Sequence, residues 1–189
     1  MRENGDTRTR IQQIALELFT EHGYEATSLR EIAERLGVTK AALYYHFKTK
    51  EDIIASLMED RAAAVEELVT WARTQERSQE MRREFLRRYS VMLQQGRHHE
   101  VMRFMERNQT ALRDHPKSEQ MRETMLTVLS ILTEPSDPLT VKVKSSMAIF
   151  AMHATWFLVR EEGHSDDERS AAGLEVALDL IESANTVRQ

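Results

Sequence analysis

Residues 27–50 read TSLREIAERLGVTKAALYYHFKTK, and they are the most informative part of the sequence. Ser28 can cap a helix, and Glu31, three residues later, can complete a capping box. The apolar side chains that follow recur every three or four residues, which is the spacing of one helical face: Leu29, Ile32, Ala33 and Leu36. The pattern predicts a short helix that ends at Leu36.

A second short helix is expected directly after the first. Gly37 can adopt a positive φ where the first helix ends, and Thr39 can cap a helix over residues 40–46. Two short helices joined by a turn of about three or four residues form a helix-turn-helix, in which the second helix enters a major groove. The stretch therefore predicts a DNA-reading domain.

The second helix has an apolar side and a polar side. Leu43 and Phe47 are expected to anchor it on its own domain. The polar side offers a cation, a small residue, two phenols and an imidazole, which suit phosphate contact and base readout: Lys40, Ala41, Tyr44, Tyr45 and His46. The alternative is a helical hairpin whose polar residues only face solvent, but such a hairpin does not need two exposed tyrosines beside a lysine.

The sequence on both sides of this stretch is also helical. An apolar stripe from Ile11 to Phe19 predicts a first helix over residues 7–22. Thr49 and Asp52 form a capping box that opens a long helix, whose apolar period continues to about Ala72. We expect this helix to link an N-terminal DNA-binding domain, residues 1–52, mechanically to a C-terminal domain, residues 53–189.

The remainder of the chain predicts further helices and contains no strand pattern. One of these helices, the sixth, is expected to carry Val101, Met102, Phe104, Met105 and Leu112 and to end before Pro116. Asp137 and Pro138 should provide the cap and first residue of an eighth helix that runs to about residue 161. Ser165 and Glu168 form a capping box for the last helix. The expected fold is all-α, with a three-helix N-terminal domain joined by a long helix to a C-terminal helical bundle, and about nine helices in total.

One C-terminal segment requires cover on more than one side. Residues 148–159, AIFAMHATWFLV, are apolar nearly all round, and such a helix must be buried on all sides. The last helix carries small residues that would allow close approach: Ala171, Ala172, Gly173 and Ala177. We therefore expect a homodimer in which the last two helices of each subunit form a four-helix interface. The alternative is a fully buried central helix in a monomer.

Composition limits the remaining classes of function. The 189 residues include 41% hydrophobic and 30% charged residues and no Cys, which is typical of a helical protein without disulfides or thiolate metal sites. No apolar run reaches the roughly 18–20 residues that a membrane helix needs. The N-terminal segment MRENGDTRTR is polar throughout and does not resemble a signal peptide, so we expect a cytoplasmic protein.

Motifs for catalysis or metal binding are not found in the sequence. It has no P-loop, no GxSxG and no dinucleotide fingerprint, so we expect neither an enzyme nor a bound cofactor. His98, His99 and Glu100 lack metal-site spacing, and helix capping explains the acidic cluster after His164. A helical enzyme or carrier, whose N-terminal motif is merely a packing unit, is the more remote alternative.

The net charge of −5 argues at first against a nucleic-acid partner, but the charge is unevenly distributed. Residues 1–50 carry 8 Lys and Arg against 7 Asp and Glu, whereas the other 139 residues carry 18 against 24. A charge of +1 is small for a DNA-binding module. We therefore expect modest affinity for each module and dependence on a dimer.

These features resemble the tetracycline-repressor (TetR) family of bacterial transcriptional regulators. The resemblance covers residues 8–58 and rests on ALELFTEHGYEATSLREIAERLGV followed by TKAALYYHFKTKEDI, in the family's order and spacing. It implies an all-helical homodimer with an N-terminal DNA-binding domain and a C-terminal domain whose small effector weakens operator binding. Carried over by position, the family's DNA contacts fall on Thr27, Ser28, Thr39, Lys40, Ala41, Tyr44, Tyr45, His46 and Lys50.

The resemblance does not identify the effector, so its pocket must be inferred from residue types. Methionine and aromatic side chains make an adaptable apolar lining, and a buried His or Tyr can orient a polar group. The candidates are Phe85, Tyr89, Met102, Met105, Met125, Phe150, His153 and Trp156. For any single one of them, ordinary core packing is the simpler interpretation.

The function expected from the sequence is a ligand-responsive transcriptional regulator, most simply a repressor. It would bind a palindromic operator as a homodimer and be released by a small molecule. The alternative is an effector-independent helix-turn-helix protein that binds DNA or shapes it.

Overall fold

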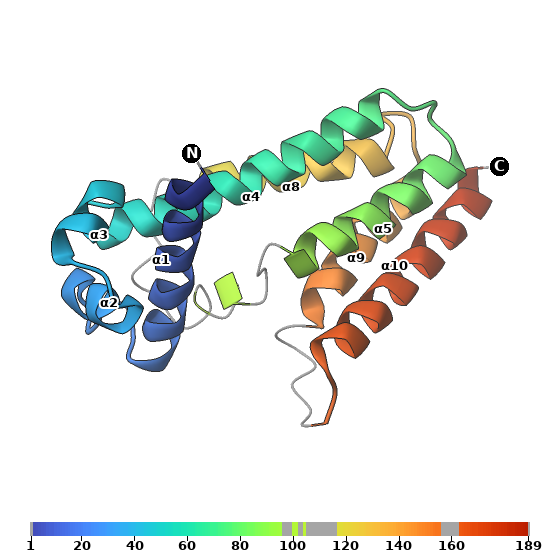
Figure 1. The fold of residues 1–189 in the computed structure, drawn as a ribbon. Helices are drawn as coiled ribbons and strands as arrows, with labels where there is room; N and C mark the ends of the chain where they lie inside the picture. The colour runs from blue at the N-terminus through green and yellow to red at the C-terminus, as the bar shows by residue number, and fades with distance from the viewer. Residues whose placement is uncertain (1, 96–99, 102–103, 105–116, 156–162, 189) are drawn as a thin grey trace. The chain divides into compact units, whose positions relative to one another are not determined.

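A computed structural model of the chain describes residues 2–95, 100–101, 104, 117–155 and 163–188. Its helices are α1 (Arg2–Glu21), α2 (Leu29–Leu36), α3 (Lys40–His46), α4 (Lys50–Arg73), α5 (Gln79–Gln95), α8 (Lys117–Leu132), α9 (Leu139–Ala154) and α10 (Asp166–Arg188) (Figure 1). Within the described ranges all regular structure is helical, which confirms the all-α prediction. Most of the helix expected over residues 101–112, and residues 156–161 of the expected eighth helix, lie outside the described residues.

None of the helices in the described ranges is both long enough and apolar enough to span a lipid bilayer.

The chain packs as two units. The N-terminal unit comprises Met1–Arg61 and Glu100–Ser118, and the C-terminal unit comprises Ala62–His99 and Glu119–Gln189. The division falls inside α4, whereas the sequence placed the domain boundary after residue 52. The first turns of α4 belong to the N-terminal unit because Ile53 and Ile54 are buried in its core.

Local hydrogen bonds fix the ends of α2 and α3. The hydroxyls of Ser28 and Thr39 each accept a bond of 3.1 Å from the backbone N–H three residues later. Gly37 has φ 74°, and its N–H donates to two carbonyls of the last turn of α2. This left-handed helix end is favourable for glycine because glycine lacks a Cβ. The predicted caps and the predicted turn are therefore confirmed.

The two predicted capping boxes in this unit differ. At α4 the box is reciprocal, because Asp52 N donates to Thr49 Oγ1 at 3.1 Å and Thr49 N donates to Asp52 Oδ2 at 2.9 Å. At α2 only the serine half forms. Glu31 Oε1 instead lies 2.7 Å from Nδ1 of His22, which follows α1. The glutamate thus ties the start of α2 to the end of α1.

The core of the N-terminal unit receives residues from far along the chain. The ring centroid of Phe19 lies 5.0 Å from that of Tyr24 and 5.5 Å from that of Phe104, and the centroids of Tyr24 and Phe104 lie 5.8 Å apart. Phe104 is fully buried, and Val101 belongs to the same cluster. The sequence placed both residues on a helix of the C-terminal domain, so the N-terminal core extends further than predicted.

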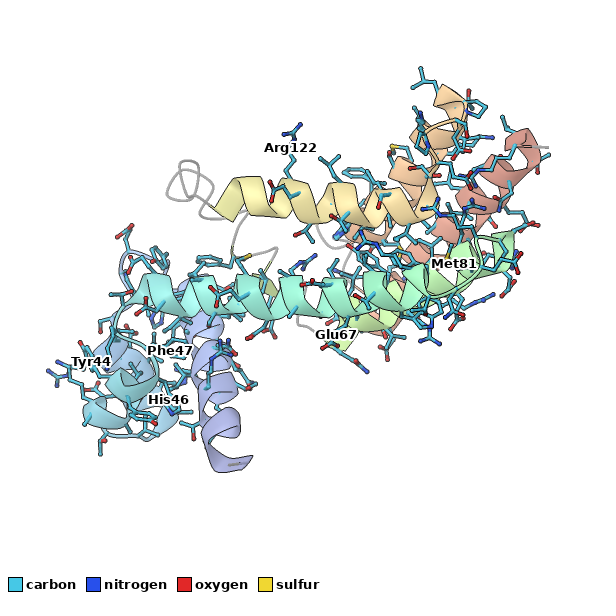
Figure 2. All side chains as sticks on the ribbon, turned by 90° about the horizontal axis from the view of Figure 1, so that it is seen from above. Tyr44, His46, Phe47, Glu67, Met81 and Arg122 are labelled. Carbon is cyan, nitrogen blue, oxygen red and sulfur yellow. The ribbon has the colours of Figure 1, made fainter. Side chains whose placement is uncertain are left out.

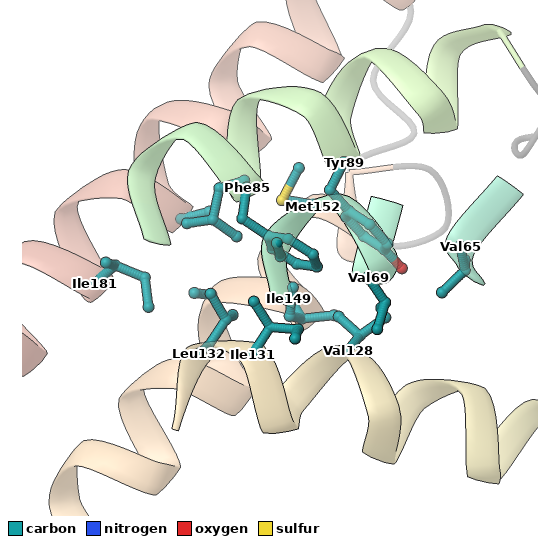
Figure 3. Packing of buried hydrophobic residues seen from close by; sticks show 14 of the residues in the cluster. Val65, Val69, Phe85, Tyr89, Val128, Ile131, Leu132, Ile149, Met152 and Ile181 are labelled. Atoms are coloured by element: carbon teal, nitrogen blue, oxygen red, sulfur yellow. The ribbon is translucent and has the colours of Figure 1, made fainter. Parts of the chain in front are cut away.

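The core of the C-terminal unit is built from α4, α5, α8, α9 and α10. Figure 3 shows how side chains from these helices meet around Phe85 and Tyr89 of α5. Gly173 of α10 permits close approach to α9, because a Cβ at this position would lie 3.1 Å from Thr155 Cγ2 and 3.2 Å from Met152 Cα. The close approach predicted for the last helix therefore exists within one chain.

Asp137 does not cap α9, which corrects the sequence prediction. The residue before α9 is Pro138, and no side chain caps that helix. Asp137 instead accepts a bond of 2.8 Å from Glu134 N and two bonds of 2.9 and 2.7 Å from the Arg188 guanidinium. Arg188 also donates to the Leu132 carbonyl at 2.6 Å. This cluster ties the end of α10 to the connection between α8 and α9.

The Arg188 guanidinium lowers the pKa of Asp137 from 3.8 to about 2. The largest cause is the hydrogen bonding from Arg188, which stabilises the carboxylate. Because the side chain of Asp137 is only 7% exposed, solvent screens this pair little.

We expect Arg188→Ala to lower the free energy of unfolding of the C-terminal unit by roughly 3 kcal/mol, since it leaves a buried carboxylate without its cation. Urea unfolding at pH 7 measures this loss. The control is Arg73→Ala at the exposed end of α4, for which a change of less than about 0.5 kcal/mol is expected.

The same comparison should depend on pH. Asp137 titrates at a lower pH in the folded chain than in the unfolded chain, so its contribution is complete above the unfolded pKa of 3.8 and is lost as pH falls through about 2. The shift corresponds to roughly 2 kcal/mol. The gap between the native chain and Arg188→Ala should therefore shrink by about this amount between pH 5 and pH 2. An unchanged gap would contradict the assigned pair.

Candidate nucleic-acid interface

The helix α3 is held by one side and open on the other. Leu43 is fully buried and Phe47 is 3% exposed, so these two side chains fix the helix on its unit as predicted. On the opposite side Lys40 and Ala41 are exposed, and Tyr45 is 70% exposed. Figure 2 labels Tyr44, His46 and Phe47 at this end of the unit. A phenol that is so open has no structural role in the core and is available to a partner.

Tyr44 and His46, the other polar residues of α3, are half-buried, and both contact neighbouring side chains. The Lys40 ammonium lies 5.5 Å from the centroid of the Tyr44 ring, and the Lys48 ammonium donates to the Tyr44 carbonyl. The ring of His46 stands edge-on to that of Tyr45 at 5.2 Å. These contacts restrict the rotamers of the side chains, so the polar side of α3 is partly preorganised.

Thr39, Ser28 and Thr27 have different surroundings although all three are predicted DNA contacts. Thr39 and Ser28 are exposed, and their hydroxyls cap α3 and α2. Thr27 is 1% exposed, and its hydroxyl donates to the Leu18 carbonyl at 3.2 Å and the Gly23 carbonyl at 2.9 Å. Thr27 therefore closes the loop between α1 and α2, and its hydroxyl is already engaged.

Lys50 is also engaged within the unit. Its ammonium donates to the carbonyls of Tyr24 and Glu25 and lies 4.5 Å from the centroid of the Tyr24 ring. The side chain is half-buried. To reach a DNA phosphate, Lys50 has to exchange these carbonyls for phosphate oxygens, which are stronger acceptors because they are charged.

A hollow of about 460 Å³ lies among these residues. The first residues of α2 and α4 border it, so backbone N–H groups at two helix starts lie at its edge. The ammonium groups of Lys40 and Lys50 and the carboxylates of Glu25 and Glu51 also line it. The hollow therefore combines donors that can receive an anion with two carboxylates that moderate its positive charge.

Tyr24 organises this region, although no sequence pattern singles it out. Its hydroxyl donates to Glu51 Oε1 at 2.8 Å, and its ring supports the Lys50 ammonium. Burial, reinforced by the hydrogen bond to Glu51, raises the pKa of the Tyr24 phenol. The pKa of Glu51 is lowered by its own backbone N–H and by the Tyr24 hydroxyl. A tyrosine in a loop between two predicted helices carries no pattern that would reveal such contacts.

The candidate effector-pocket residues do not form one set. Phe85, Tyr89 and His153 meet in the C-terminal core, where Tyr89 Oη lies 3.1 Å from His153 Nε2 and the rings of Phe85 and Tyr89 stack at 6.1 Å. Met125 packs against this core and is half-buried. Phe150 is 45% exposed, so it does not line an interior pocket. The candidates Met102, Met105 and Trp156 lie outside the described residues.

Acidic and histidine side chains in the described part of the chain do not gather in groups of three that could hold a metal ion.

Comparison with known proteins supports a nucleic-acid interface at this site. Residues 11–57 match the family of bacterial regulatory proteins named tetR. The chain is similar to the HTH-type transcriptional regulator AcrR of Shigella flexneri, with 42% identity over 66 residues, which are 35% of this chain and 31% of that protein. It is also similar to the transcriptional repressor KstR2 of Mycolicibacterium smegmatis, with 36% identity over 28% of this chain and 26% of that protein. Each match thus covers about a third or less of the relative's length.

Solved structures extend the likeness in fold over nearly the whole chain. The TetR-family regulator PfmR of Thermus thermophilus superimposes with a TM-score of 0.65 at 23% identity and covers 95% of this chain and 97% of its own. A TetR-family regulator of Bordetella parapertussis gives 0.67 at 18% identity, covering 93% of each chain. At such identities the agreement concerns the fold, and the sequence evidence for the family comes from the N-terminal residues.

Phe104 should stabilise the N-terminal unit although it lies 43 residues beyond Arg61. We expect Phe104→Leu to remove its ring contacts with Phe19 and Tyr24 and to cost about 1 kcal/mol. Amide hydrogen exchange of α1 near Phe19 should then become several-fold faster. The same change at an exposed site, Phe150→Leu, is the control and should leave α1 unaffected. Unchanged exchange in Phe104→Leu would remove residue 104 from this core.

Proposed function

The N-terminal domain of this chain belongs to the TetR family of bacterial regulatory proteins, and on that premise we propose that the chain is a ligand-responsive transcriptional repressor. It would act in the cytoplasm as a homodimer on a palindromic operator. One observation carries the proposal: α3 is anchored by Leu43 and Phe47 and leaves Lys40, Ala41 and Tyr45 open to a partner. These residues lie within the segment that matches the family.

The proposed contacts have two roles: some position the domain on the DNA backbone, and others read the base sequence. Ser28, Lys40, Tyr44 and Lys50 border the hollow and would bind phosphate oxygens, which fixes the register of the domain on the duplex. Ala41, Tyr45 and His46 would meet base edges, and the methyl groups of Thr39 and Ala41 suit a thymine methyl better than a bidentate pair. Thr27 would contribute through the loop that it closes.

A second subunit is proposed because α9 exposes an apolar strip. Leu139 is 77% exposed, and Val143, Met147 and Phe150 follow it at helical spacing with exposures of 45–51%. The neighbouring α10 also exposes Val176 and Val187. An apolar face of this kind marks a protein interface. Two-fold pairing of α9 and α10 would bury the strip and place two copies of α3 on successive major grooves, roughly 34–36 Å apart.

A response to a small effector is supported by two residues that follow the C-terminal helix α5 in sequence but belong to the N-terminal core. Val101 and Phe104 follow α5 in sequence and are buried in the N-terminal core. A ligand that changes the packing of the region around them would therefore act directly on the DNA-binding unit. A full switch from 1:99 to 99:1 requires about 5.5 kcal/mol of preference for one state.

One observation favours the alternative of an effector-independent DNA-binding protein. Phe85, Tyr89 and His153 satisfy one another by stacking and hydrogen bonding in a closely packed core. A screen of small molecules by thermal shift separates the two functions, because an effector raises the melting temperature by mass action. Hits that also weaken DNA binding support the repressor, whereas a screen with no hits favours the alternative.

DNA binding is tested with the duplex upstream of the gene and a scrambled duplex of equal length. Lys40→Ala should weaken binding to both and reduce the slope of log affinity against log salt by about 1, since one phosphate contact is lost. Tyr45→Ala should weaken binding to the native duplex by roughly 1–3 kcal/mol and the scrambled duplex less. Arg122→Ala, an exposed cation on α8, is the control (Figure 2). Equal losses for Tyr45→Ala on both duplexes would contradict a role in sequence readout.

Dimerisation is tested by placing a charge in the centre of the α9 strip. Met147→Glu should shift the chain from dimer to monomer in sedimentation at micromolar concentration, because a carboxylate would be buried without a partner. Leu126→Glu is the matched control, since Leu126 is 53% exposed but lies on α8. If Met147→Glu remains dimeric, or if both variants dissociate, the strip is not the specific interface.

A further inference from the structure

A groove of about 810 Å³ lies between α4 and α5 of the C-terminal unit, apart from the buried Tyr89 and His153. Its apolar surface is formed by Ala64, Leu68 and Trp71 of α4 with Val91 and Met92 of α5. Val91 is 48% exposed, so apolar surface faces the solvent here. The volume falls in the range of small-molecule sites, which is about 300–1,000 Å³.

Trp71 offers an indole face on which a cation already rests. The Arg88 guanidinium lies 4.0 Å from the centroid of the Trp71 ring. Tryptophan binds cations more strongly than the other aromatic residues do, because its ring has the most negative face. Arg88 is a half-exposed side chain and can move aside. The arginine thus marks a position at which a ligand cation would be stabilised.

The groove is lined by two carboxylates and two guanidinium groups, and among the described residues one of these carboxylates has no ion pair. Arg88 pairs with Glu84 at 2.8 Å, and Arg87 pairs with Glu80 at 3.0 Å. Glu67 also lines the groove, one helical turn before Trp71, but no cation among the residues that the structure describes pairs with it. In Figure 2 Glu67 projects from α4 on the side away from α8. Within the described ranges, the groove therefore has an unpaired carboxylate next to its aromatic surface.

We propose that this groove binds an organic cation with an apolar body. The cationic centre would lie on the Trp71 ring beside the Glu67 carboxylate, in place of the Arg88 guanidinium. The body would cover Leu68, Val91 and Met92. An organic anion fits less well, because both arginines of the groove already have acidic partners and Glu67 would repel it. Methionine and leucine side chains adapt to apolar groups of different shape, so the site would discriminate between ligands by their charge more than by their shape.

The inference deepens the proposed function, because it names a class of effector, and it rests on that function only for the effect of binding on DNA. Binding itself is a property of the C-terminal unit. It is tested without DNA.

The test uses two probes of nearly equal shape and opposite charge, tetraphenylphosphonium and tetraphenylborate. The chain has two tryptophans, so Trp156→Phe leaves Trp71 as the single tryptophan, whose emission is excited selectively over that of the four tyrosines. Tetraphenylphosphonium should quench this fluorescence saturably, with an affinity at least about ten times that of tetraphenylborate. Calorimetric titration of the native chain gives the same comparison if Trp156→Phe fails to fold. Equal affinities, or tighter binding of the anion, would overturn the proposal.

Two substitutions at the groove should act in opposite directions. Glu67→Gln should weaken binding of the phosphonium by roughly three- to tenfold, since it removes the unpaired carboxylate. Arg88→Gln should strengthen it several-fold, since it frees the Trp71 ring from a competing cation. Glu66→Gln removes the adjacent exposed charge outside the groove and is the matched control. The proposal is wrong if Glu66→Gln acts as strongly as Glu67→Gln or if Arg88→Gln weakens binding.

A gel shift with the upstream duplex then separates this inference from the proposed function. Binding of the phosphonium with the predicted variant pattern establishes the cation site, whether or not DNA is released. Loss of DNA binding on saturation, absent in Glu67→Gln, makes the groove an effector site. Failure of the chain to bind DNA at all overturns the proposed function and leaves the fluorescence result standing.

Discussion

The packing of Tyr24 is the interaction on which the N-terminal unit depends. Helices of eight and seven residues, as α2 and α3 are, do not persist alone in water, so their position is set by what holds them. The Tyr24 ring packs against Phe19 and Phe104, its hydroxyl bonds Glu51, and its face and carbonyl hold Lys50. One loop residue thus joins the end of α1, the start of α4 and a segment that follows α5.

The features that could be predicted from the sequence depend on contacts between residues that are close together along the chain. The Ser28 and Thr39 caps, the left-handed Gly37 and the reciprocal box of Thr49 and Asp52 all use contacts within four residues. Periodicity likewise gave the anchoring of α3 by its buried apolar side. These local signals suffice to place a helix-turn-helix, because its short elements are defined by their ends.

What could not be predicted depends on contacts between distant residues. Asp137 precedes a proline and has the pattern of a cap, but Arg188, 51 residues later, binds both of its oxygens. Phe104 belongs to an apolar pattern that predicts a helix of the C-terminal domain, yet its ring packs on Phe19. Phe150 is an aromatic residue of the kind that lines apolar pockets, but it is exposed on α9. Periodicity identifies which side of a helix is apolar, and it does not specify what covers that side.

The small charge of the DNA-binding module makes these distant contacts relevant to control. Residues 1–50 carry a net charge of +1, so phosphate attraction alone would hold one module weakly, and occupancy would depend on two modules binding together if the proposed function holds. Under the proposed function, a ligand then needs only to disturb the relation between the two copies. The strip on α9, the groove between α4 and α5 and the open side of α3 belong to different helices, so the proposed pairing, ligand binding and DNA reading would not compete for the same side chains. Because the Phe104 ring packs on Tyr24 and the Tyr24 ring supports the Lys50 ammonium, residue 104 is linked through packing to a proposed phosphate contact that lies outside α3.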